Sequence, residues 1–449
     1  MVTALGGLPA HHDVTWVASA MSEEDRAVAA ERGSSFLEET AEGAGYRLRL
    51  VPHDPATYER FYNVFANPTL WFLQHYLWGL GSAPDFGPRL HEAWSDGYVP
   101  VNEAFAAATL EELERQPDAA VLFHDYHLYL APRLVREARP EIVTSHFVHI
   151  PWPEPDYWHA LPVGLRAALH DGLLANDLVG FHTERWRRAF LLCAERLLGA
   201  TVDRDAGTVV HRGRRTRVVA RPIGVDPAEF DRLGQDSGVL EREASLEARR
   251  PEHLILRVDR IDPSKNVVRG FHAFALLLNE HPELHGRVSM AALLAPSRQD
   301  IPEYADYAGA VETAAQEVND RFGREDWEPV DLDIADDFLR SVAGYKQFDV
   351  LLVNPVFDGL NLVAKEAFLV NEHHGVLVLS ENAGVHEELG EWALTVNPLD
   401  VSGQADAMYE ALTLERAERR RRAGAIRDQV RANDIQKWIG SQLDDLDAV

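Results

Sequence analysis

Short β-rich runs alternate with longer amphipathic stretches through both halves of the chain, and this alternation limits the possible folds most. In the first half the β-rich runs are Val121–Phe123, Ile142–Val148, Leu178–Phe181 and Arg217–Arg221. In the second half they are Leu254–Val258, Val288–Leu294, Val350–Asn354 and Gly375–Leu379. Because several runs lack the alternation of a half-exposed strand, we expect strands buried on both faces, as in parallel sheets covered by helices.

The stretches between these runs have the length and apolar spacing of helices. The main ones are Leu128–Ala138, Val163–Leu174, Glu184–Leu198, Val267–Glu280 and Ile301–Phe322. Strand–helix alternation in both halves predicts two doubly wound α/β domains. The Arg-, Glu- and Ala-rich stretch Glu415–Arg431 predicts an exposed helix with a solvated face.

The chain has 449 residues, more than one hydrophobic core usually organises. A boundary is expected near Pro222–Arg250, where a Pro-Ile-Gly-Val-Asp-Pro segment leaves the first sheet and a charged connector follows. We therefore expect one domain over residues 1–225, a second over residues 226–430, and a C-terminal helix over residues 431–449 that packs back on the first domain. Open α/β sheets bind ligands at the carboxyl ends of their strands, which predicts a site in a cleft between the domains.

Charge and cysteine content exclude several classes of partner. The 44 Lys and Arg residues against 72 Asp and Glu give a formal charge of −28, which disfavours nucleic acid and anionic membranes as partners. A phosphate site must therefore depend on a few placed cations and helix N-termini. The single cysteine, Cys193, the lack of an apolar run near ~20 residues and the lack of a signal pattern predict a soluble, cytoplasmic protein.

The strongest local pattern is the segment from Asn354 to Glu366. An apolar strand leads into a turn, and Asp358-Gly359 is expected to open a helix whose first N–H groups face outward. A diphosphate is the natural ligand of such a helix end, and Glu366, two helical turns further, could reach the hydroxyls of a ribose. The alternative is that Asp358 only caps the helix.

A second pattern, Arg257 to Asn266, ends a strand and places two cations in the following loop. Arg260 can grip a phosphate through two hydrogen bonds, and Lys265 adds a compact charge. Together they could neutralise a departing diphosphate without a metal ion. The alternative for both is an ordinary surface salt bridge.

Histidines cluster in two further segments, His124-Asp-Tyr-His127 and His146-Phe-Val-His-Ile-Pro-Trp-Pro153. A metal site built from His124, Asp125, His127 and His149 is one interpretation, but no zinc-finger spacing is present. The simpler interpretation is polar groups at strand ends that face sugar hydroxyls. Aromatic residues are dense in Phe61–Trp71 and at Trp152, Tyr157 and Trp158, where core filling competes with packing against sugar rings.

Six motifs in a fixed order carry a resemblance to a known family. They are Phe61-Tyr-Asn through Leu-Trp71, Trp94 through Val-Asn102, His124-Asp-Tyr-His-Leu128, His149-Ile-Pro-Trp-Pro153, Val258-Asp-Arg-Ile-Asp-Pro-Ser-Lys265 and Asp358-Gly-Leu-Asn-Leu-Val-Ala-Lys-Glu366. With these motifs the chain resembles the trehalose-6-phosphate synthases, glycosyltransferase family 20. The resemblance runs from about Thr15 to the C-terminus and implies a GT-B fold, with two facing Rossmann-like domains and an interdomain cleft.

The resemblance implies a role for each matched residue. Tyr62, Trp71 and Asp125 are expected to hold glucose 6-phosphate, with Arg298 at the acceptor phosphate. Arg260 and Lys265 would hold the donor diphosphate, and His149 and Asp358 the donor glucose. The remaining donor contacts implied are Gly359, Leu360, the backbone amides of Asn361, Leu362 and Val363, the ribose ligand Glu366, and His182, which is Gln in some relatives.

The implied reaction transfers glucose from a nucleoside diphosphate glucose to glucose 6-phosphate with retention of configuration, giving trehalose 6-phosphate. Asp125, His149, Arg260, Lys265 and Asp358 are the expected catalytic residues. The departing phosphate takes the acceptor proton, so neither a metal, a cofactor nor a pair of flanking carboxylates is implied. The oligomeric state stays open, a homo-oligomer included.

Two departures from the family pattern stand out. Relatives begin with an extra strand, an arginine for the acceptor phosphate and a Gly-Gly loop, whereas here Met1–Leu5 aligns with the helix that follows them. We therefore expect that the start of the chain is misassigned or truncated. Gly6-Gly7 cannot replace the Gly-Gly loop, because it lies on the wrong side of the helix start. In the donor loop, Pro263 stands where many relatives have an aromatic residue, and Asn266 stands where they have glycine.

Two other functions remain open at this point. One is a pseudo-glycosyltransferase that couples a nucleotide-linked cyclitol to an amino-cyclitol phosphate, although Tyr62, Trp71, Asp358 and Glu366 together favour a glucosyltransferase. The other is a non-catalytic sugar-phosphate sensor. For the donor base, the acidic segment Asp331–Asp337 favours GDP-glucose over UDP-glucose, because carboxylates accept the N–H groups of guanine, unless this segment is only a solvated turn.

Overall fold

The computed structural model describes residues 12–33, 35–39, 45–81 and 83–449, which form two compact units. One unit comprises the chain up to Arg221 together with Ile439–Val449, and the other comprises Pro222–Trp438. The division falls four residues before the expected boundary at 225, and the C-terminal segment changes unit at 439, not at 431. Among the described residues, no helix combines the length and apolarity that crossing a bilayer requires.

The unit from Pro222 to Trp438 is built on one six-stranded sheet in which every pairing is parallel. The strand order is β12-β11-β10-β13-β14-β15. The strands are β10 (His253–Arg260), β11 (Val288–Ala295), β12 (Val330–Ile334), β13 (Val350–Val353), β14 (Val376–Ser380) and β15 (Leu394–Val396). The order reverses between β10 and β13, so the loops that follow these two strands meet where doubly wound sheets bind nucleotides.

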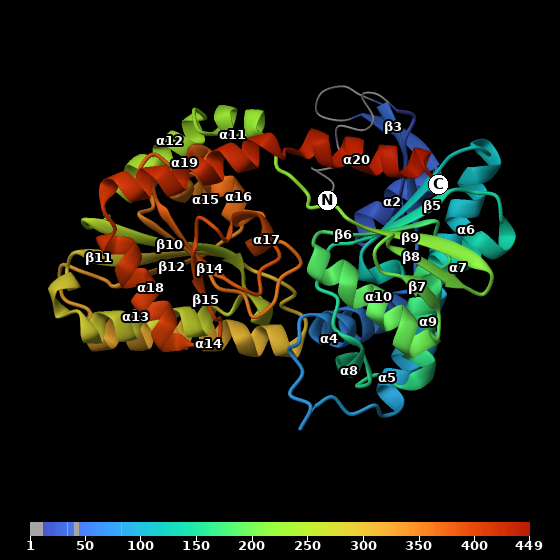
Figure 1. Cartoon of the computed structure of the whole chain (residues 1–449), viewed down its shortest axis with the longest axis horizontal. Coiled ribbons are helices and arrows are strands. Elements are labelled where there is room, and N and C mark those ends of the chain that lie inside the picture. The colour runs from blue at the N-terminus through green and yellow to red at the C-terminus, as the bar shows by residue number, and fades with distance from the viewer. Residues whose placement is uncertain (1–11, 34, 40–44, 82) are drawn as a thin grey trace. The chain divides into compact units, whose positions relative to one another are not determined.

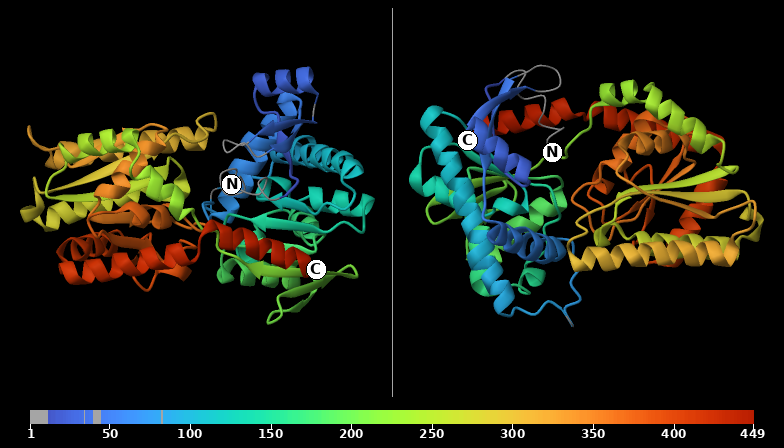
Figure 2. Two further views of the ribbon diagram at one scale, coloured as in Figure 1. Left: turned by 90° about the horizontal axis from the view of Figure 1, so that it is seen from above. Right: turned by 180° about the vertical axis from the view of Figure 1, so that it is seen from behind.

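Helices cover both faces of this sheet, as Figure 1 shows. On one face lie α13 (Val267–Glu280), α14 (Pro302–Phe322) and α18 (Val401–Thr413), and their apolar sides share a core with the strands. The other face carries α11 (Pro227–Leu233), α12 (Ser237–Glu247), α15 (Phe338–Gln347), α16 (Val363–Val370) and α19 (Arg416–Ala432), and α17 (His386–Leu389) lies near α19. Figure 2 shows the two helix layers of this unit from above and from behind.

Helix α19 is less exposed than its charged sequence predicts. Ala423, Ile426 and Val430 are buried against the unit. Arg427 donates to the carbonyls of Phe368 and Asn371 at 2.9 and 2.8 Å, and Arg422 donates to those of Trp392 and Ala393. These arginines therefore satisfy the carbonyl groups of neighbouring segments on one side of the helix, while Arg420, Arg421 and Asp428 on the other side form the expected solvated face.

The other unit contains a six-stranded mixed sheet of order β4-β5-β6-β9-β8-β7. Its strands are β4 (Val121–His124), β5 (Thr144–Val148), β6 (Leu178–Phe181), β7 (Thr201–Asp203), β8 (Thr208–His211) and β9 (Arg214–Ala220). The first four in space are parallel, but β7, β8 and β9 pair antiparallel, so this sheet is doubly wound only in part. The two-residue turn Arg212-Gly213, with φ of 51° and 78°, explains the β8–β9 hairpin.

A separate three-stranded sheet and a set of helices complete this unit. The sheet has the order β1-β3-β2, from β1 (Thr15–Ser19), β2 (Ser35–Glu39) and β3 (Gly45–Val51). The α-helices are α2 (Glu23–Arg32), α3 (Pro55–Glu59), α4 (Phe72–Gln74), α5 (Pro88–Ala93), α6 (Val99–Arg115), α7 (Ala131–Ala138), α8 (Pro155–Trp158), α9 (Val163–Leu173) and α10 (Glu184–Leu198). Two π-helical segments are η2 (Arg60–Trp71) and η3 (Trp94–Tyr98).

The last helix, α20 (Ile435–Asp447), contributes its C-terminal part to the same unit. Leu446 is buried against Leu178 and Val219. Asp445, itself 4% exposed, accepts two hydrogen bonds from Arg221 at 2.8 and 2.9 Å. The end of the chain is thus held against β6 and β9 by both apolar packing and a two-point ion pair.

Candidate functional site

Arg260 and Lys265 lie in the loop that follows β10, as the sequence predicts. Arg260 is the exposed last residue of the strand, and Lys265 ends a 3-10 turn, η5 (Pro263–Lys265). Asp262 caps this turn by accepting from the N–H and hydroxyl of Ser264 at 2.9 and 2.7 Å. Pro263 fits the turn because the first position of a helical turn needs no N–H donor.

Asn266 ends the turn in the left-handed conformation, with φ 58° and ψ 36°. This conformation is ordinary for glycine and tolerated by asparagine, which explains how Asn266 can replace the glycine expected there. Its side chain donates to the carbonyls of Asn354 and Pro398 at 3.0 and 2.7 Å. These bonds tie the loop after β10 to the loops after β13 and β15.

The loop after β13 differs from the expectation that Asp358-Gly359 opens a helix. Helix α16 begins at Val363, and Asn361 caps it by accepting from the N–H of Ala364 at 3.2 Å. Asp358 is held five residues before this start, because its N–H donates to the carbonyl of Asn382 and its own carbonyl accepts from the N–H of Gly384. Asp358 is therefore not the helix cap, and its carboxylate is directed to other partners.

Lys265 and Asp358 form the central contact between the two loops. The Lys265 Nζ donates to Oδ2 of Asp358 at 2.5 Å, and the side-chain amide of Asn361 donates to the same oxygen at 3.2 Å. Both side chains of the ion pair are largely buried, with 13% and 15% exposure. The pairing places the ammonium group beside the beginning of α16.

A cavity of about 250 Å³ joins these elements within one unit. It is lined by Val258, Asp259, Arg260, Lys265, Leu293, Ala295, Ala335, Asp336, Asp337, Phe338, Ser341, Asn361, Leu362 and Val363. In the part of the chain that the structure describes, the N–H groups of Leu362 and Val363 donate to no protein acceptor. Two cations and two available amides at a helix end thus face one space, which is the arrangement that binds phosphate groups.

A buried arginine that sequence analysis assigned no role positions this loop. Arg257 is fully buried and donates to Asp259 at 2.8 Å, to the carbonyl of Lys265 at 3.0 Å and to Asn354 at 3.2 Å. Burial raises the pKa of Asp259 although Arg257 opposes the shift. Arg257 belongs to the motif of the strand and its loop, but only the fold shows that its guanidinium holds the backbone carbonyl of Lys265.

Glu366 lies one turn into α16, not two, because the helix begins late. Its Oε2 accepts a hydrogen bond from the hydroxyl of Tyr345 at 3.1 Å. Burial raises the pKa of Glu366 to about 7. No sequence signal pointed to Tyr345, whose helix α15 is distant in the chain.

Arg298 lies in the loop after β11 in a left-handed conformation with φ 46°. Its guanidinium donates to the hydroxyl of Tyr304 at 2.5 Å and to Asp262 at 3.4 Å. Arg298 does not line the 250 Å³ cavity, although Asp262 connects it to the loop that carries Lys265.

In the other unit, Asp125, His149 and His182 directly follow the neighbouring strands β4, β5 and β6. The N–H of His149 donates to Oδ1 of Asp125 at 3.3 Å, and Nε2 of His146 lies 2.9 Å from the carbonyl of Asp125. Asp125 has φ 64° and ψ 179°, a conformation that costs roughly 1–3 kcal/mol outside glycine. The strand ends therefore bring these predicted residues together, with strain concentrated at Asp125.

Three histidines form a continuous chain at these strand ends. Nδ1 of His124 lies 3.2 Å from Nε2 of His149, and Nδ1 of His149 lies 3.2 Å from Nε2 of His182. Burial lowers the pKa of His124 to about 4 and holds the pKa of His149 well below its usual range. Neutral rings carry one N–H each, so the tautomer of His124 is coupled to that of His149.

Tyr62 and Trp71 lie at opposite ends of the π-helical segment η2. Tyr62 is half-buried and stacks on His127 with ring centroids 5.9 Å apart, whereas Trp71 is buried and stacks on His75 at 4.0 Å. π-Helical turns are uncommon and occur often at functional sites. By contrast, Trp152 and Trp158 are fully buried, so they fill the core.

Tyr98 and Asn102 hold the loop that contains Asp125. The hydroxyl of Tyr98 donates to the carbonyl of Tyr126 at 2.7 Å. Asn102 donates to the carbonyl of His127 at 3.0 Å and accepts from the N–H groups of Leu130 and Ala131, each at 3.1 Å. The motif from Trp94 to Asn102 thus supports the site through backbone contacts, a role that its residue types alone did not reveal.

No group of three or more His, Cys, Asp or Glu residues suited to a metal ion occurs among the described positions. At the cluster considered from the sequence, ring nitrogens of His124 and His149 face each other and Asp125 accepts a backbone N–H. The predicted departures at Met1–Leu5 and Gly6-Gly7 lie outside the described residues.

Comparison with known proteins identifies the family. The model of glycosyltransferase family 20 matches residues 1–448. The chain is 36% identical to a validamine 7-phosphate valienyltransferase of Streptomyces hygroscopicus subsp. jinggangensis over 438 residues, 97% of this chain and 86% of the relative. It is 36% identical to the trehalose-6-phosphate synthase of Mycolicibacterium vanbaalenii over 417 residues, 89% of this chain and 80% of the relative.

Solved structures give the same result. An E. coli structure with UDP-2-fluoro glucose bound superposes with a TM-score of 0.88 at 30% identity, over 100% of this chain and 95% of that chain. A trehalose-6-phosphate synthase studied with bisubstrate glycomimetics superposes with a TM-score of 0.85 at 32% identity, over 100% of this chain and 96% of that chain. The fold is GT-B. The chain belongs to glycosyltransferase family 20.

Proposed function

We propose that this glycosyltransferase moves glucose from a nucleoside diphosphate glucose to glucose 6-phosphate, with retention, to give trehalose 6-phosphate. The observation that carries the proposal is the 250 Å³ cavity in which Arg260, Lys265 and the amides of Leu362 and Val363 converge. Such a site neutralises a sugar-linked diphosphate without a metal ion or cofactor.

In the proposed mechanism, charge develops on the departing diphosphate as the bond from the anomeric carbon to the phosphate oxygen breaks. Arg260 and Lys265 stabilise that charge, and Asp358 orients Lys265 through the 2.5 Å bond. The acceptor hydroxyl attacks from the face that the diphosphate leaves and passes its proton to the departing phosphate oxygen. The protein then needs no pair of acid and base carboxylates, because positioning and charge supply the catalysis.

For the acceptor, the proposal assigns Tyr62, Trp71 and Asp125 to the glucose ring and Arg298 to its phosphate. Asp125 can accept hydrogen bonds from sugar hydroxyls, and its strained backbone fixes the direction of the carboxylate. His149 and His182 would contact the donor glucose.

For the donor base, we propose GDP-glucose ahead of UDP-glucose. Asp331, Asp333 and Asp337 each pair with an arginine, so the acidic segment is more than a solvated turn. Asp336 is exposed and lines the cavity beside Phe338, a residue that is 48% exposed. A carboxylate next to an open aromatic face suits a purine that offers N–H donors.

A second candidate is transfer of a cyclitol to an amino-cyclitol phosphate. It is favoured by the 36% identity to a validamine 7-phosphate valienyltransferase. The diphosphate cavity would serve both reactions, since both release a nucleoside diphosphate. The two functions would differ in the acceptor that Tyr62, Trp71 and Asp125 hold.

Release of nucleoside diphosphate separates these functions. The protein is incubated with GDP-glucose, UDP-glucose or a nucleotide-linked cyclitol as donor, and with either glucose 6-phosphate or an amino-cyclitol phosphate as acceptor. Turnover that depends on glucose 6-phosphate supports the proposal, and turnover only with a cyclitol donor and acceptor supports the second candidate. Binding of both substrates without release of the diphosphate would instead show a sugar-phosphate sensor.

A further inference from the structure

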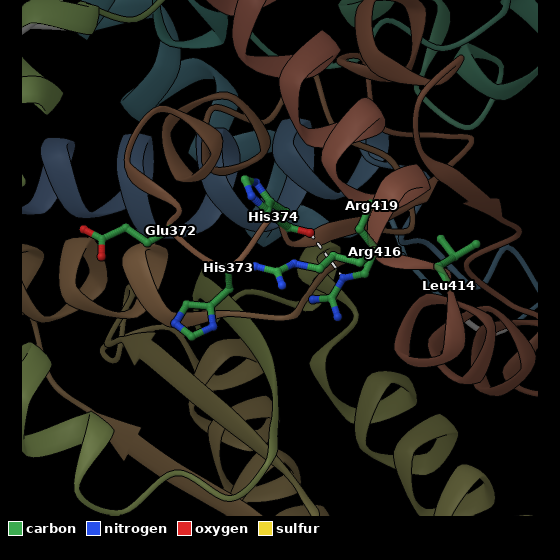
Figure 3. A pocket seen from close by; sticks show the side chains of 6 residues that line it. All are labelled: Glu372, His373, His374, Leu414, Arg416 and Arg419. Atoms are coloured by element: carbon green, nitrogen blue, oxygen red, sulfur yellow. Dashed lines mark hydrogen bonds between the residues drawn. The ribbon is translucent and has the colours of Figure 1, made fainter.

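A second cavity, of about 460 Å³, lies in the unit from Pro222 to Trp438. We call it the basic pocket, and it is lined by Glu372, His373, His374, Leu414, Arg416 and Arg419. In the view of Figure 3 the arginine side chains lie between the two histidines and Leu414. The lining comes from the loop between α16 and β14, from Leu414 between α18 and α19, and from the beginning of α19, which carries both arginines.

The basic pocket lies at the amino ends of the strands, whereas the diphosphate cavity lies at their carboxyl ends. Its histidines precede β14, and Asp349 and Arg250, which bond to its lining, precede β13 and β10. The diphosphate cavity is instead lined by residues that end or follow strands, such as Arg260 after β10. The eight residues of β10 separate the two ends of the strands by roughly 25 Å.

One buried carboxylate organises the cations around the basic pocket. Oδ1 of Asp349 accepts from Arg419 at 2.9 Å, and Oδ2 accepts from Arg250 at 2.5 Å. Two guanidinium groups therefore share one negative charge. Arg419 also donates from Nε to the carbonyl of His374 at 3.3 Å, which holds the histidine loop against α19.

The histidines are held by the same arginines. Nη1 of Arg250 lies 3.3 and 3.2 Å from the two ring nitrogens of His373. His374 adopts φ 52°, a left-handed conformation that is uncommon for a residue with a Cβ atom. Contacts with the surrounding structure must stabilise this conformation, so the pocket wall at His374 has a defined backbone geometry.

Arg416 supplies a cation that the protein does not neutralise. In the part of the chain that the structure describes, Arg416 forms no ion pair, and its side chain is exposed at the pocket. Partial burial lowers the pKa of His374, and the positive charges of Arg420, Arg427, Arg416 and Arg419 lower it further. This local positive field is unusual in a chain with a formal charge of −28.

We propose that the basic pocket binds a phosphate-bearing small anion, such as inorganic phosphate or a sugar phosphate, at a site separate from the diphosphate cavity. Arg416 and Arg419 donate charge-assisted hydrogen bonds to the phosphate, and the ring N–H groups of the histidines complete the set of donors. The volume is sufficient for a phosphate with an attached sugar-sized group.

The test is calorimetric titration of the full chain with inorganic phosphate. Wild type is compared with R416E, with the neutral variant R416Q and with R421E, a matched control on the same helix whose arginine is paired with Glu418 outside the pocket. We expect phosphate binding to weaken roughly tenfold or more in R416E, to weaken less in R416Q and to stay unchanged in R421E. Far-ultraviolet circular dichroism checks that each variant folds.

A double variant, R260A with K265A, separates this site from the diphosphate cavity. We expect the Arg416-dependent phosphate binding to persist in the double variant. Unchanged phosphate binding in R416E, or its loss in the double variant, would overturn the proposal. In the double variant, Arg416-dependent binding that is tighter for glucose 6-phosphate than for phosphate identifies a sugar phosphate as the ligand, whereas equal binding identifies phosphate itself.

Discussion

The ammonium group of Lys265 lies 2.5 Å from Oδ2 of Asp358, although the two residues come from loops after different strands. This ion pair joins the loop after β10 to the loop after β13 at the point where the strand order of the sheet reverses. It holds a positive charge at the start of α16 while no diphosphate is bound. Under the proposed mechanism, Lys265 is thereby oriented in advance for the charge that develops on the departing diphosphate.

Removal of the Lys265 charge tests this role. We expect K265M to lower kcat/KM for the nucleotide sugar by about a hundredfold or more, because a charge stabiliser of the departing diphosphate is lost. D358N should lower kcat more than it weakens binding of the free nucleoside diphosphate, because it frees Lys265 from its orienting partner. R287A removes a cation from an exposed pair with Glu252 and serves as the control, with activity unchanged. Full activity of K265M would contradict the proposed mechanism.

The histidine chain predicts loss of stability in acid. Burial lowers the pKa of His124 from 6.5 to about 4, so the unfolded state binds more protons than the folded state between these values. Stability is therefore lost as the pH falls from 6.5 towards 4, by up to about 3 kcal/mol from this residue. Urea unfolding at several pH values should show a smaller acid loss in H124Q than in wild type. Parallel pH profiles of the two proteins would contradict this assignment.

The backbone conformation of Asp125 is expected to reduce the stability of the protein, while its carboxylate is expected to be needed for activity. Its φ of 64° with ψ of 179° is accessible to glycine without strain. We expect D125G to be more stable than D125A by roughly 1–3 kcal/mol, because both lose the carboxylate but only glycine relieves the backbone. Both variants should lose activity with glucose 6-phosphate. Equal denaturation midpoints for the two variants would show that the backbone of Asp125 is not strained.

Glu366 predicts loss of stability with rising pH. Burial raises its pKa from 4.5 to about 7, so the folded state keeps a proton that the unfolded state has lost. Stability contributed by the neutral carboxyl is lost as the pH rises from 4.5 through 7, by on the order of 3 kcal/mol. We expect E366Q to flatten the decrease in melting temperature between pH 5 and pH 8. A decrease as steep as that of wild type would place the titration elsewhere.

Asp336 predicts the choice of donor base. We expect D336N to lower kcat/KM for GDP-glucose roughly tenfold and to affect that for UDP-glucose much less, because guanine presents two adjacent N–H donors to a carboxylate whereas uracil presents one. The matched control is D333N, whose carboxylate is paired with Arg340 and does not line the cavity. Equal losses with both donors, or a strong preference of wild type for UDP-glucose, would contradict the assignment.

Sequence patterns located the central strands well because buried parallel strands are continuously apolar. The run Leu178–Phe181 coincides with β6, and Glu184–Leu198 coincides with α10, which Thr183 caps and left-handed Gly199 ends. The exact ends of helices and strands were predicted less well where they depend on turns in the adjoining loops. The expected helix at Leu128 begins at Ala131, because Tyr126–Leu128 first forms a 3-10 turn.

For the candidate site, motifs identified the residues but not their partners. Arg260, Lys265, Asn361, Leu362 and Val363 do line one cavity. The delayed start of α16 was missed because it depends on Asn361 as a cap and on backbone bonds to Asn382 and Gly384, which are distant in sequence. The bond from Tyr345 to Glu366 and the contact between His124 and His149 likewise depend on tertiary packing, which no local pattern encodes.

The most direct test of the central claim is the identity of the product formed without added metal. The protein is incubated with GDP-glucose or UDP-glucose and glucose 6-phosphate in the presence of a chelator, and the product is analysed by nuclear magnetic resonance. The account predicts one equivalent of nucleoside diphosphate for each α,α-linked trehalose 6-phosphate, with product formation lost in K265M. No disaccharide phosphate from either donor, with substrates bound and the protein folded, would contradict it.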